Sequence, residues 1–197
     1  MSAALLFDLP AMPALTKPPE PIVRAAEVEG CCRFTLSRRW SAGPLMACIG
    51  CNPSYADAKR DDPTMWRVMG FAYRWGFGGV TMLNVTPCIT PDVAEMRAWI
   101  ATDLPVVHIA IAENIKRVAA ALRTASLHLA AWGNLVPEDD VAEFLFALAE
   151  ERGHEPIDWH CFGVTNSGAP KHPMARGKHR IPDDAKPERW RFSASSA

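Results

Sequence analysis

Three polar side chains of this sequence stand where they could do chemistry together. Asn52, Asn84 and His172 each follow a short apolar run, and each lies in a loop that also contains a proline. An asparagine amide can orient a water molecule, and a histidine can donate a hydrogen bond or move a proton near neutral pH. Singly, an Asn before Pro is a common turn former and a His-Pro pair is often only a loop corner. Together, the three residues predict one polar active site.

The elements that must position these residues follow from hydrophobic periodicity. Apolar runs predict strands at 45–50, 80–83, 127–132 and 159–164, and the alternating segment 33–40 predicts an N-terminal edge strand. Helical spacing and capping residues predict helices at about 62–75, 92–100, 105–123 and 137–152. This alternation implies a three-layer α/β/α domain with a mainly parallel central sheet of about four strands plus the edge strand. In such sheets, ligands bind beyond the carboxyl ends of the strands.

Length and composition bound the organisation of the chain. Its 197 residues have room for one such domain, and 49% hydrophobic with 22% charged residues is typical of a folded protein. We predict an extended proline-rich arm over 1–27, a single α/β catalytic domain over 28–175 and a basic tail over 176–197. Because the net charge is −1, a nucleic acid could bind only at a local basic patch, and the tail is the expected patch.

Short motifs around the three polar residues resemble the signature motifs of the uracil-DNA glycosylase superfamily, in the same order. They are Gly50-Cys51-Asn52-Pro53-Ser54, Leu83-Asn84-Val85 and His172-Pro173. The resemblance implies a uracil-DNA glycosylase-like fold in which Asn52 positions the water that attacks the sugar C1′. It also implies that Asn84 recognises the pyrimidine edge and that His172 stabilises charge on the departing base. Ser54 replaces the usual final glycine, and Met174 replaces the usual serine after His-Pro.

A second resemblance covers more of the chain. The stretch from Arg39 to Trp75, with Asn-Pro-Ser-x-Ala-Asp-Ala and Asp-Asp-Pro-Thr, resembles a bacterial and phage protein family of unknown function. The later Ala-Ala-Trp-Gly and Gly-x-Pro-x-His-Pro runs belong to the same likeness, which spans about residues 31–175. It indicates family membership and says little about a substrate.

The resemblance to uracil-DNA glycosylases implies a monofunctional DNA glycosylase that hydrolyses the N-glycosidic bond of a damaged or modified pyrimidine and leaves an abasic site. Hypermodified bases of phage DNA, and hence phage defence, fall within this prediction. The base must be flipped out of a duplex to be reached. Asn52 and His172 are the predicted catalytic residues. The predicted base-binding residues are Asn84, Tyr55, Ser54 and Asp57, and the predicted DNA-binding residues are Lys171, Met174, Arg176, Lys178 and Arg180.

Alternatives stay open at this point. A hydrolase of free nucleosides or nucleotides would use the same Asn and His without the basic segment, and a non-catalytic module would bind modified bases without cleaving them. Asp57, Asp61 and Asp62 form an acidic cluster beside the first loop. Asp62 is predicted to cap the following helix, whereas Asp57 or Asp61 is either a solvated turn residue or a general base.

No cofactor or metal is expected. Cys48 and Cys51 form a CxxC pair, but no second pair accompanies it. Six cysteines, mostly in apolar runs, and no secretory signal pattern predict a cytoplasmic protein with free thiols. No apolar stretch approaches the roughly 20 residues of a membrane span. We therefore expect a monomer that binds DNA and no membrane.

Overall fold

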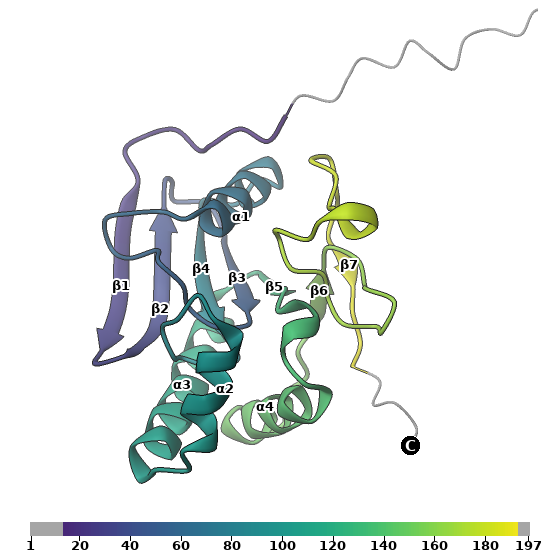
Figure 1. Ribbon diagram of the computed structural model, residues 1–197. Coiled ribbons are helices and arrows are strands. Elements are labelled where there is room, and N and C mark those ends of the chain that lie inside the picture. Colours follow the sequence, from purple (N-terminus) through teal and green to yellow (C-terminus); the bar gives the residue numbers. More distant parts are fainter. Residues whose placement is uncertain (1–13, 193–197) are drawn as a thin grey trace, which may run out of the picture.

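One mixed β-sheet organises the computed structural model, which describes residues 14–192 (Figure 1). Within that range the sheet has seven strands in the order β1-β2-β4-β3-β5-β6-β7. Their bounds are β1 Val23–Glu29, β2 Cys32–Arg39, β3 Leu45–Gly50, β4 Gly79–Asn84, β5 Leu127–Ala130, β6 Trp159–Cys161 and β7 Glu188–Arg189. The four inner strands β4, β3, β5 and β6 are parallel. The flanking strands β1, β2 and β7 pair antiparallel.

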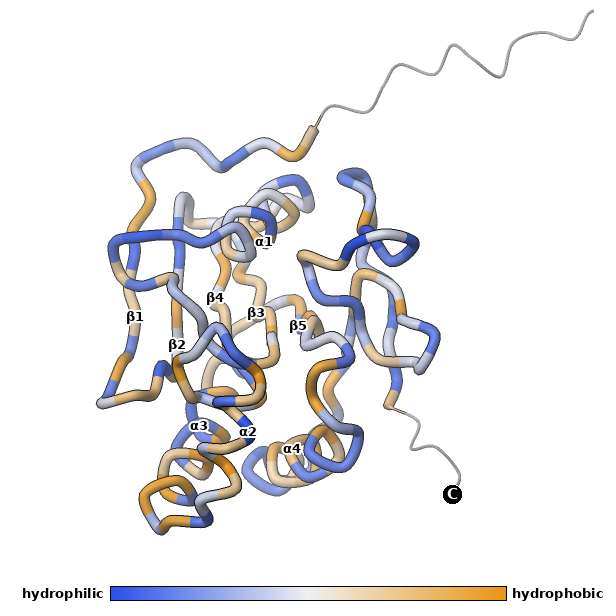
Figure 2. Tube along the Cα trace, in the orientation of Figure 1, coloured by the Kyte–Doolittle hydropathy of each residue, from blue (hydrophilic) through white to orange (hydrophobic). Residues whose placement is uncertain are grey.

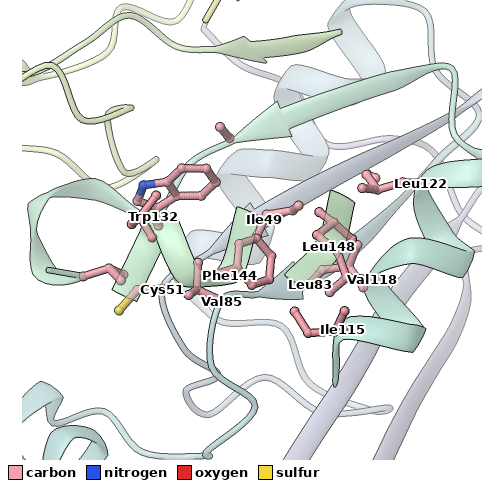
Figure 3. Packing of buried hydrophobic residues seen from close by; sticks show 14 of the residues in the cluster. Ile49, Cys51, Leu83, Val85, Ile115, Val118, Leu122, Trp132, Phe144 and Leu148 are labelled. Carbon is pink, nitrogen blue, oxygen red and sulfur yellow. The ribbon is translucent and has the colours of Figure 1, made fainter. Parts of the chain in front are cut away.

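In the described part of the chain, four α-helices cover the two faces of this sheet. They are α1 Pro63–Arg74, α2 Val93–Ala101, α3 Pro105–Thr124 and α4 Glu138–Glu151. Alternate residues of β3 face opposite sides, since successive strand side chains point to opposite faces. Met46 and Cys48 pack with α1, whereas Ala47 and Ile49 pack with α2, α3 and α4. Figure 3 shows the second of these cores, where Ile49 and Leu83 meet Val118 and Leu148.

The predicted α/β class and the three-layer arrangement are therefore confirmed, while the sheet is larger and more mixed than predicted. Each predicted inner strand and helix is present within a few residues of its expected bounds. Hydropathy explains this agreement, because β3, β4 and β5 are apolar and lie at the centre of the molecule (Figure 2). Strands buried on both faces read as continuous apolar runs, which are easy to recognise in a sequence.

The predicted N-terminal arm over 1–27 is wrong for its last residues. Residues 1–13 lie outside the described range, and 14–22 run without regular structure, apart from one bend, along α1. There Lys17 places its ammonium 3.5 Å from the centre of the Trp66 ring. From Val23 onward the chain forms β1, the true edge strand, which hydrogen-bonds β2. The residues of β1 are mostly exposed and include charged side chains, so its sequence lacks the apolar pattern of a strand. Hydrogen bonds to β2 hold it in an extended conformation.

The predicted basic tail over 176–197 is also wrong for the residues that the structure describes. Residues 176–192 wrap back over the domain, and 193–197 lie outside the described range. Ile181 is buried in the core with α1, and Trp190 stacks edge-on against Trp132 at 5.2 Å. Between them, β7 adds a strand to the sheet. This segment is part of the fold. No helix among residues 14–192 is long and apolar enough to span a membrane.

Candidate active site

A cavity of about 230 Å³ opens at the carboxyl ends of β3 and β4. Its polar lining brings together four of the residues predicted from the sequence with two that the sequence did not indicate as site residues. They are Asn52, Ser54, Asn84 and His172, together with Arg33 and Asp62. The apolar part of the wall includes Leu36, Met65 and Met82. The predicted convergence of Asn52, Asn84 and His172 at the strand ends is thus present in the structure.

The strands bring these residues together through their register. Gly50 at the end of β3 pairs with Asn84 at the end of β4, and Asn52 follows two residues later. A Cβ atom on Gly50 would lie 2.9 Å from Met82 Cε and 3.1 Å from the Asn84 amide. A side chain at position 50 would therefore push on the flexible end of Met82 and on the Asn84 amide, so glycine leaves these two cavity residues undisturbed. His172 arrives from the loop after β6, which is tied to the end of β5 by a 2.9 Å hydrogen bond from Gly133 N–H to Pro170 O.

The Asn52 amide is held by the backbone on one side only. Its Nδ2 donates to Thr90 O at 2.6 Å and to Pro53 O at 3.2 Å. Its Oδ1 accepts no hydrogen bond from residues 14–192. Because the donor end is fixed, the acceptor end is left to a ligand or a water molecule in the cavity.

Asn84 is 2% exposed and lies at the bottom of the cavity. Oriented to satisfy its neighbours, its amide donates from Nδ2 to Leu83 O at 3.1 Å and to Asn52 O at 3.3 Å. Behind it, the fully buried Asn114 of α3 donates to Asn84 O at 2.9 Å and to Val85 O at 3.1 Å. Asn114 was missed by sequence reasoning. The sequence feature that could have identified it is a polar residue on the apolar face of a predicted helix.

His172 is half-buried, and its Nδ1 accepts a 3.1 Å hydrogen bond from Met174 N–H. A nitrogen that accepts a hydrogen bond carries no proton, so the neutral ring is protonated on Nε2. Burial lowers the pKa of His172, and the charge of Asp62 opposes this shift. At neutral pH the residue is therefore an uncharged donor through Nε2–H, which has no partner within residues 14–192.

Asp62 does two things at once. Its Oδ1 accepts a 2.7 Å hydrogen bond from Met65 N–H, which caps α1 as predicted. It also lines the cavity, where it is the only carboxylate among the described lining residues. The sequence predicted the cap and missed this second position, because a capping residue at a helix start gives no sign of which cavity it faces.

The structure does not bring the other candidates of the first loop into the cavity. Tyr55 is 72% exposed and Asp57 lies outside the lining, so neither predicted base contact has support in this geometry. The Asp57 carboxylate accepts from Lys59 N–H and Arg60 N–H, both at 2.7 Å, and these bonds lower its pKa. Asp61 pairs with Arg38 at 2.6 Å. Both acids therefore hold the loop in shape, and a general-base role for them is not favoured.

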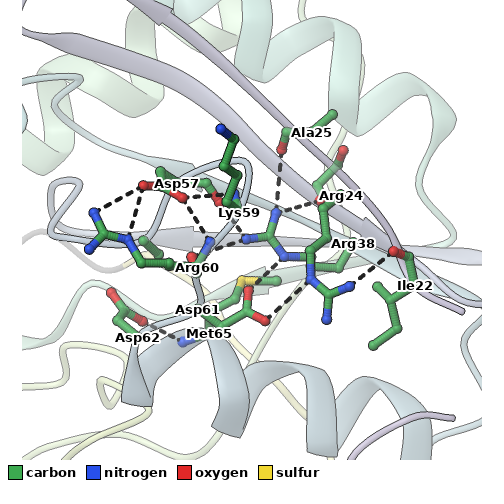
Figure 4. Close-up of polar contacts among 12 residues, drawn as sticks. Ile22, Arg24, Ala25, Arg38, Asp57, Lys59, Arg60, Asp61, Asp62 and Met65 are labelled. Carbon is green, nitrogen blue, oxygen red and sulfur yellow. Dashed lines mark hydrogen bonds and ion pairs between the residues drawn. The ribbon is translucent and has the colours of Figure 1, made fainter. Parts of the chain in front are cut away.

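Two buried arginines of β2, Arg33 and Arg38, hydrogen-bond to the loop between β3 and α1 (Figure 4 shows Arg38 and its partners). Arg38 donates from Nε to Asp61 Oδ1 at 2.6 Å and from Nη2 to Asp57 O at 2.6 Å. Arg33 donates from Nη1 to Ala56 O at 2.6 Å. Because a rigid guanidinium group donates in fixed directions, these hydrogen bonds set the path of the chain between Asn52 and Asp62.

The predicted DNA-binding residues do not line the cavity. Arg176, Lys178 and Arg180 are exposed around the short 3₁₀ turn Gly177–His179. Lys171 is half-buried and is directed towards β6 and β7: a Cβ on Gly163 would lie 3.6 Å from its Nζ and 3.7 Å from Glu188. Met174 lines a separate depression beside α1. Contact of these residues with DNA stays a prediction.

No group of three or more His, Cys, Asp or Glu side chains is placed to hold a metal ion within residues 14–192. All six cysteines are free thiols, and five of them are buried. Burial raises the pKa of Cys51 to about 11, so this thiol beside the cavity is protonated at neutral pH. Cys48 and Cys51 of the CxxC pair lie in the core, where neither acts as a reactive thiolate.

Residues 33–174 match the family described as "Protein of unknown function (DUF1643)". The chain belongs to this family. The matched region contains the cavity with Asn52, Asn84 and His172, and it ends before the C-terminal segment that carries Arg176, Lys178 and Arg180. No curated protein and no solved structure matches the chain. The likeness to uracil-DNA glycosylases thus rests on the short motifs alone.

Proposed function

We propose that this protein is a monofunctional DNA glycosylase that hydrolyses the N-glycosidic bond of a damaged or modified pyrimidine. The observation that carries the proposal is the pairing, in one cavity, of an amide acceptor and an imidazole donor whose other ends are fixed by the backbone. These are Oδ1 of Asn52 and Nε2–H of His172. Preorganised groups of this kind stabilise a transition state without reorganising during the reaction.

The size of the cavity supports a ligand of one heterocycle. Its volume of about 230 Å³ is below the roughly 300–1,000 Å³ typical of sites for drug-sized ligands. Its wall combines apolar side chains such as Met65 and Met82 with the amide of Asn84. A cavity in which apolar side chains lie beside a fixed amide is suited to a flat base that hydrogen-bonds along one edge. A base within a DNA duplex would enter this cavity by flipping.

The proposed reaction uses three side chains. Asn52 Oδ1 accepts a hydrogen bond from a water molecule, whose oxygen attacks the sugar C1′ as the bond from C1′ to the base nitrogen breaks. The electron pair of that bond leaves with the base, and His172 Nε2–H donates a hydrogen bond to the base oxygen that takes up the charge. Asp62 accepts the proton released by the water. The products are a free base and an abasic sugar.

The test is incubation of the purified protein with DNA duplexes that contain uracil, a thymine mismatch, 5-hydroxymethylcytosine or glucosylated hydroxymethylcytosine. Alkaline cleavage then converts each abasic site into a strand break. We expect breaks on one class of substrate and their loss in Asn52→Ala. His172→Gln should still bind the DNA and should cleave at least about 100-fold more slowly, since it keeps a donor but misplaces it. An absence of abasic sites on every substrate would reject the proposal.

A second candidate is a hydrolase of free nucleosides or nucleotides. One observation favours this candidate. The basic side chains predicted to bind DNA all lie in the described part of the chain, and none of them lines the cavity. An enzyme that acts on small molecules needs the cavity and no surface for a DNA strand. Release of base from free nucleosides or nucleotides by the wild type, lost in Asn52→Ala, would identify it. Tight binding of a modified-base DNA without any abasic product would instead indicate a binding module.

A further inference from the structure

Arg33 is a buried cation at the cavity whose charge the fold leaves unpaired. The residue is 4% exposed and lines the cavity. Within residues 14–192 its guanidinium makes one hydrogen bond, from Nη1 to Ala56 O, and no ion pair. Its Nε is buried without any partner. Buried polar groups are nearly always hydrogen-bonded, so a guanidinium that lines a cavity with donors left over is suited to bind an acceptor from a ligand.

The neighbouring Arg38 shows what a purely structural arginine looks like in this protein. Arg38 comes from the same strand, is equally buried, and pairs with Asp61 while also donating to carbonyl oxygens. Within residues 14–192 the Arg33 side chain donates to a single carbonyl oxygen and forms no ion pair, although the charge of Asp62 acts on it across the cavity. Burial lowers the pKa of Arg33 to about 10, which still leaves it charged at neutral pH. An unpaired buried charge is costly, and an anionic ligand would offset that cost.

The sheet order separates Arg33 from His172. Arg33 is the second residue of β2 and donates its N–H to Pro87 O in the loop after β4, whereas His172 packs against Gly133 after β5. Asn84 and Asn52 lie at the ends of the two strands between them. Arg33 therefore lies on the far side of Asn84 and Asn52 from His172, where it can meet a group attached to a ring held between them.

We propose that Arg33 is an oxyanion-binding residue of this cavity, and that the ligand is a pyrimidine compound bearing a carboxylate or phosphate group. The planar fork of donors on a guanidinium matches the oxygens of either group. The inference deepens the proposed function and rests on it for the pyrimidine part of the ligand. A carboxylate on the base fits a glycosylase, because DNA phosphates stay at the mouth of a cavity. A 5′-phosphate fits a hydrolase of free nucleotides.

Direct binding tests this proposal without any turnover. The affinity of the full chain is measured by isothermal titration calorimetry for two matched pairs: orotate against uracil, and uridine 5′-monophosphate against uridine. We expect at least one charged probe to bind about 10- to 100-fold more tightly than its neutral partner, as charge-assisted hydrogen bonds predict. A gain for orotate alone places the charge on the base, and a gain for the nucleotide alone places it on the phosphate.

Variants assign the effect to Arg33. Arg33→Met should remove the preference for the charged probe, and Arg33→Lys should keep part of it, since an ammonium retains the charge without the fork. Arg152→Met is the matched control. Arg152 is also buried, its Nε and Nη1 also lack partners, and it lies at the end of α4 outside the cavity lining. Its substitution should leave both affinities unchanged.

Three outcomes would overturn the proposal: equal affinities within both pairs, no binding of any probe at millimolar concentration, or a preference that survives in Arg33→Met. If Arg33→Met does not fold, the wild-type comparison and Arg33→Lys decide the question instead. Failure of the glycosylase proposal is distinguishable, since it appears as an absence of abasic sites and leaves the binding of the charged probes intact.

Discussion

At the cavity, Asn52 and His172 each use one polar atom on the backbone and leave the other free. Thr90 O holds Nδ2 of Asn52, and Met174 N–H holds Nδ1 of His172. These bonds decide which end of an otherwise two-sided group faces the ligand. Asp62 is held in the same way. Its Oδ1 accepts a hydrogen bond from the start of α1, while its Oδ2 accepts no hydrogen bond from residues 14–192 and is left for the ligand.

The two roles of Asp62 can be separated by substitution. Asn is as good an N-cap as Asp, so Asp62→Asn should change the free energy of unfolding by only about a few tenths of a kcal/mol. If Asp62 accepts the proton from water, the same change should slow single-turnover cleavage by about 100-fold. Chemical denaturation and rapid-quench kinetics measure the two effects.

Asp62→Ala is the control for this pair. It removes both the cap and the carboxylate, and should cost about 1 kcal/mol of stability in addition to the loss of rate. Equal cleavage rates in Asp62→Asn and the wild type would show that Asp62 only caps α1.

Stability should depend on pH through His172 and His128. Burial lowers the pKa of both residues in the folded protein from an ordinary value of 6.5. Below about pH 6.5 the unfolded chain therefore binds more protons than the folded protein, and stability falls as the pH falls towards the lower folded pKa values. Above that window this contribution is constant. The free energy of unfolding, measured by denaturant titration between about pH 5 and pH 8, should show this loss, and His172→Gln should reduce its slope.

Among the elements, the loops after the strands carry the site, and other elements fix their shape. Arg33 and Arg38 of β2 hold the loop from β3 to α1. Asn114 of α3 holds the end of β4. The loop that carries His172 is fixed by close packing on Gly133, where a Cβ would lie 3.2 Å from His172 Cβ. Each loop is thus positioned by residues far away in the sequence.

Gly133→Ala should act on both the backbone and the site. Gly133 has a φ of +72°, so any side chain there should cost about 1 kcal/mol of stability. The added methyl group would also press on His172 and should lower cleavage. Gly153→Ala is the matched control, since Gly153 has a φ of +66° and open space around it. We expect a similar loss of stability in thermal unfolding for both, with cleavage reduced only in Gly133→Ala; equal rates would argue against the packing effect.

For the molecule as a whole, the C-terminal segment joins the distant parts of the fold. It packs against α1 through Ile181 and an ion pair from Asp183 to Arg67 at 2.9 Å, and Trp75 Nε1–H donates to Ala185 O at 3.0 Å. It then continues through β7 to Trp190 beside Trp132 on the other side of the sheet. Truncating this segment would therefore unfold part of the core. Such a deletion cannot test whether its basic residues bind DNA.

Neutralising the charges alone gives the sharper test. The triple substitution Arg176→Ala, Lys178→Ala and Arg180→Ala removes three exposed cations and no buried group. If these cations bind phosphates, affinity for DNA should fall, and the slope of log affinity against log salt should decrease by about 1 for each phosphate that is no longer bound. Fluorescence anisotropy across a salt series measures both quantities, and the melting temperature should not change.

The control for that experiment removes three exposed cations elsewhere, with Arg39→Ala, Lys116→Ala and Arg123→Ala on β2 and α3. It has the same net charge and should leave the salt slope close to that of the wild type. Identical behaviour of the two triple variants would mean that DNA does not touch the segment around Gly177–His179.

The sequence by itself determined the elements whose signals lie within a short stretch of the chain. Apolar runs and caps such as Asp62 marked the inner strands and the helices, because buried strands and helix starts have composition of their own. It also placed Asn52, Asn84 and His172 at strand ends, where a parallel sheet brings loops together. Only the tertiary structure decided which further side chains join them. Arg33 and Asp62 belong to the cavity while Tyr55 and Asp57 do not, since that choice depends on packing between segments far apart in the chain. For the same reason β1 and β7 emerge only in the fold, where a neighbouring strand supplies the hydrogen bonds that their own sequences do not specify.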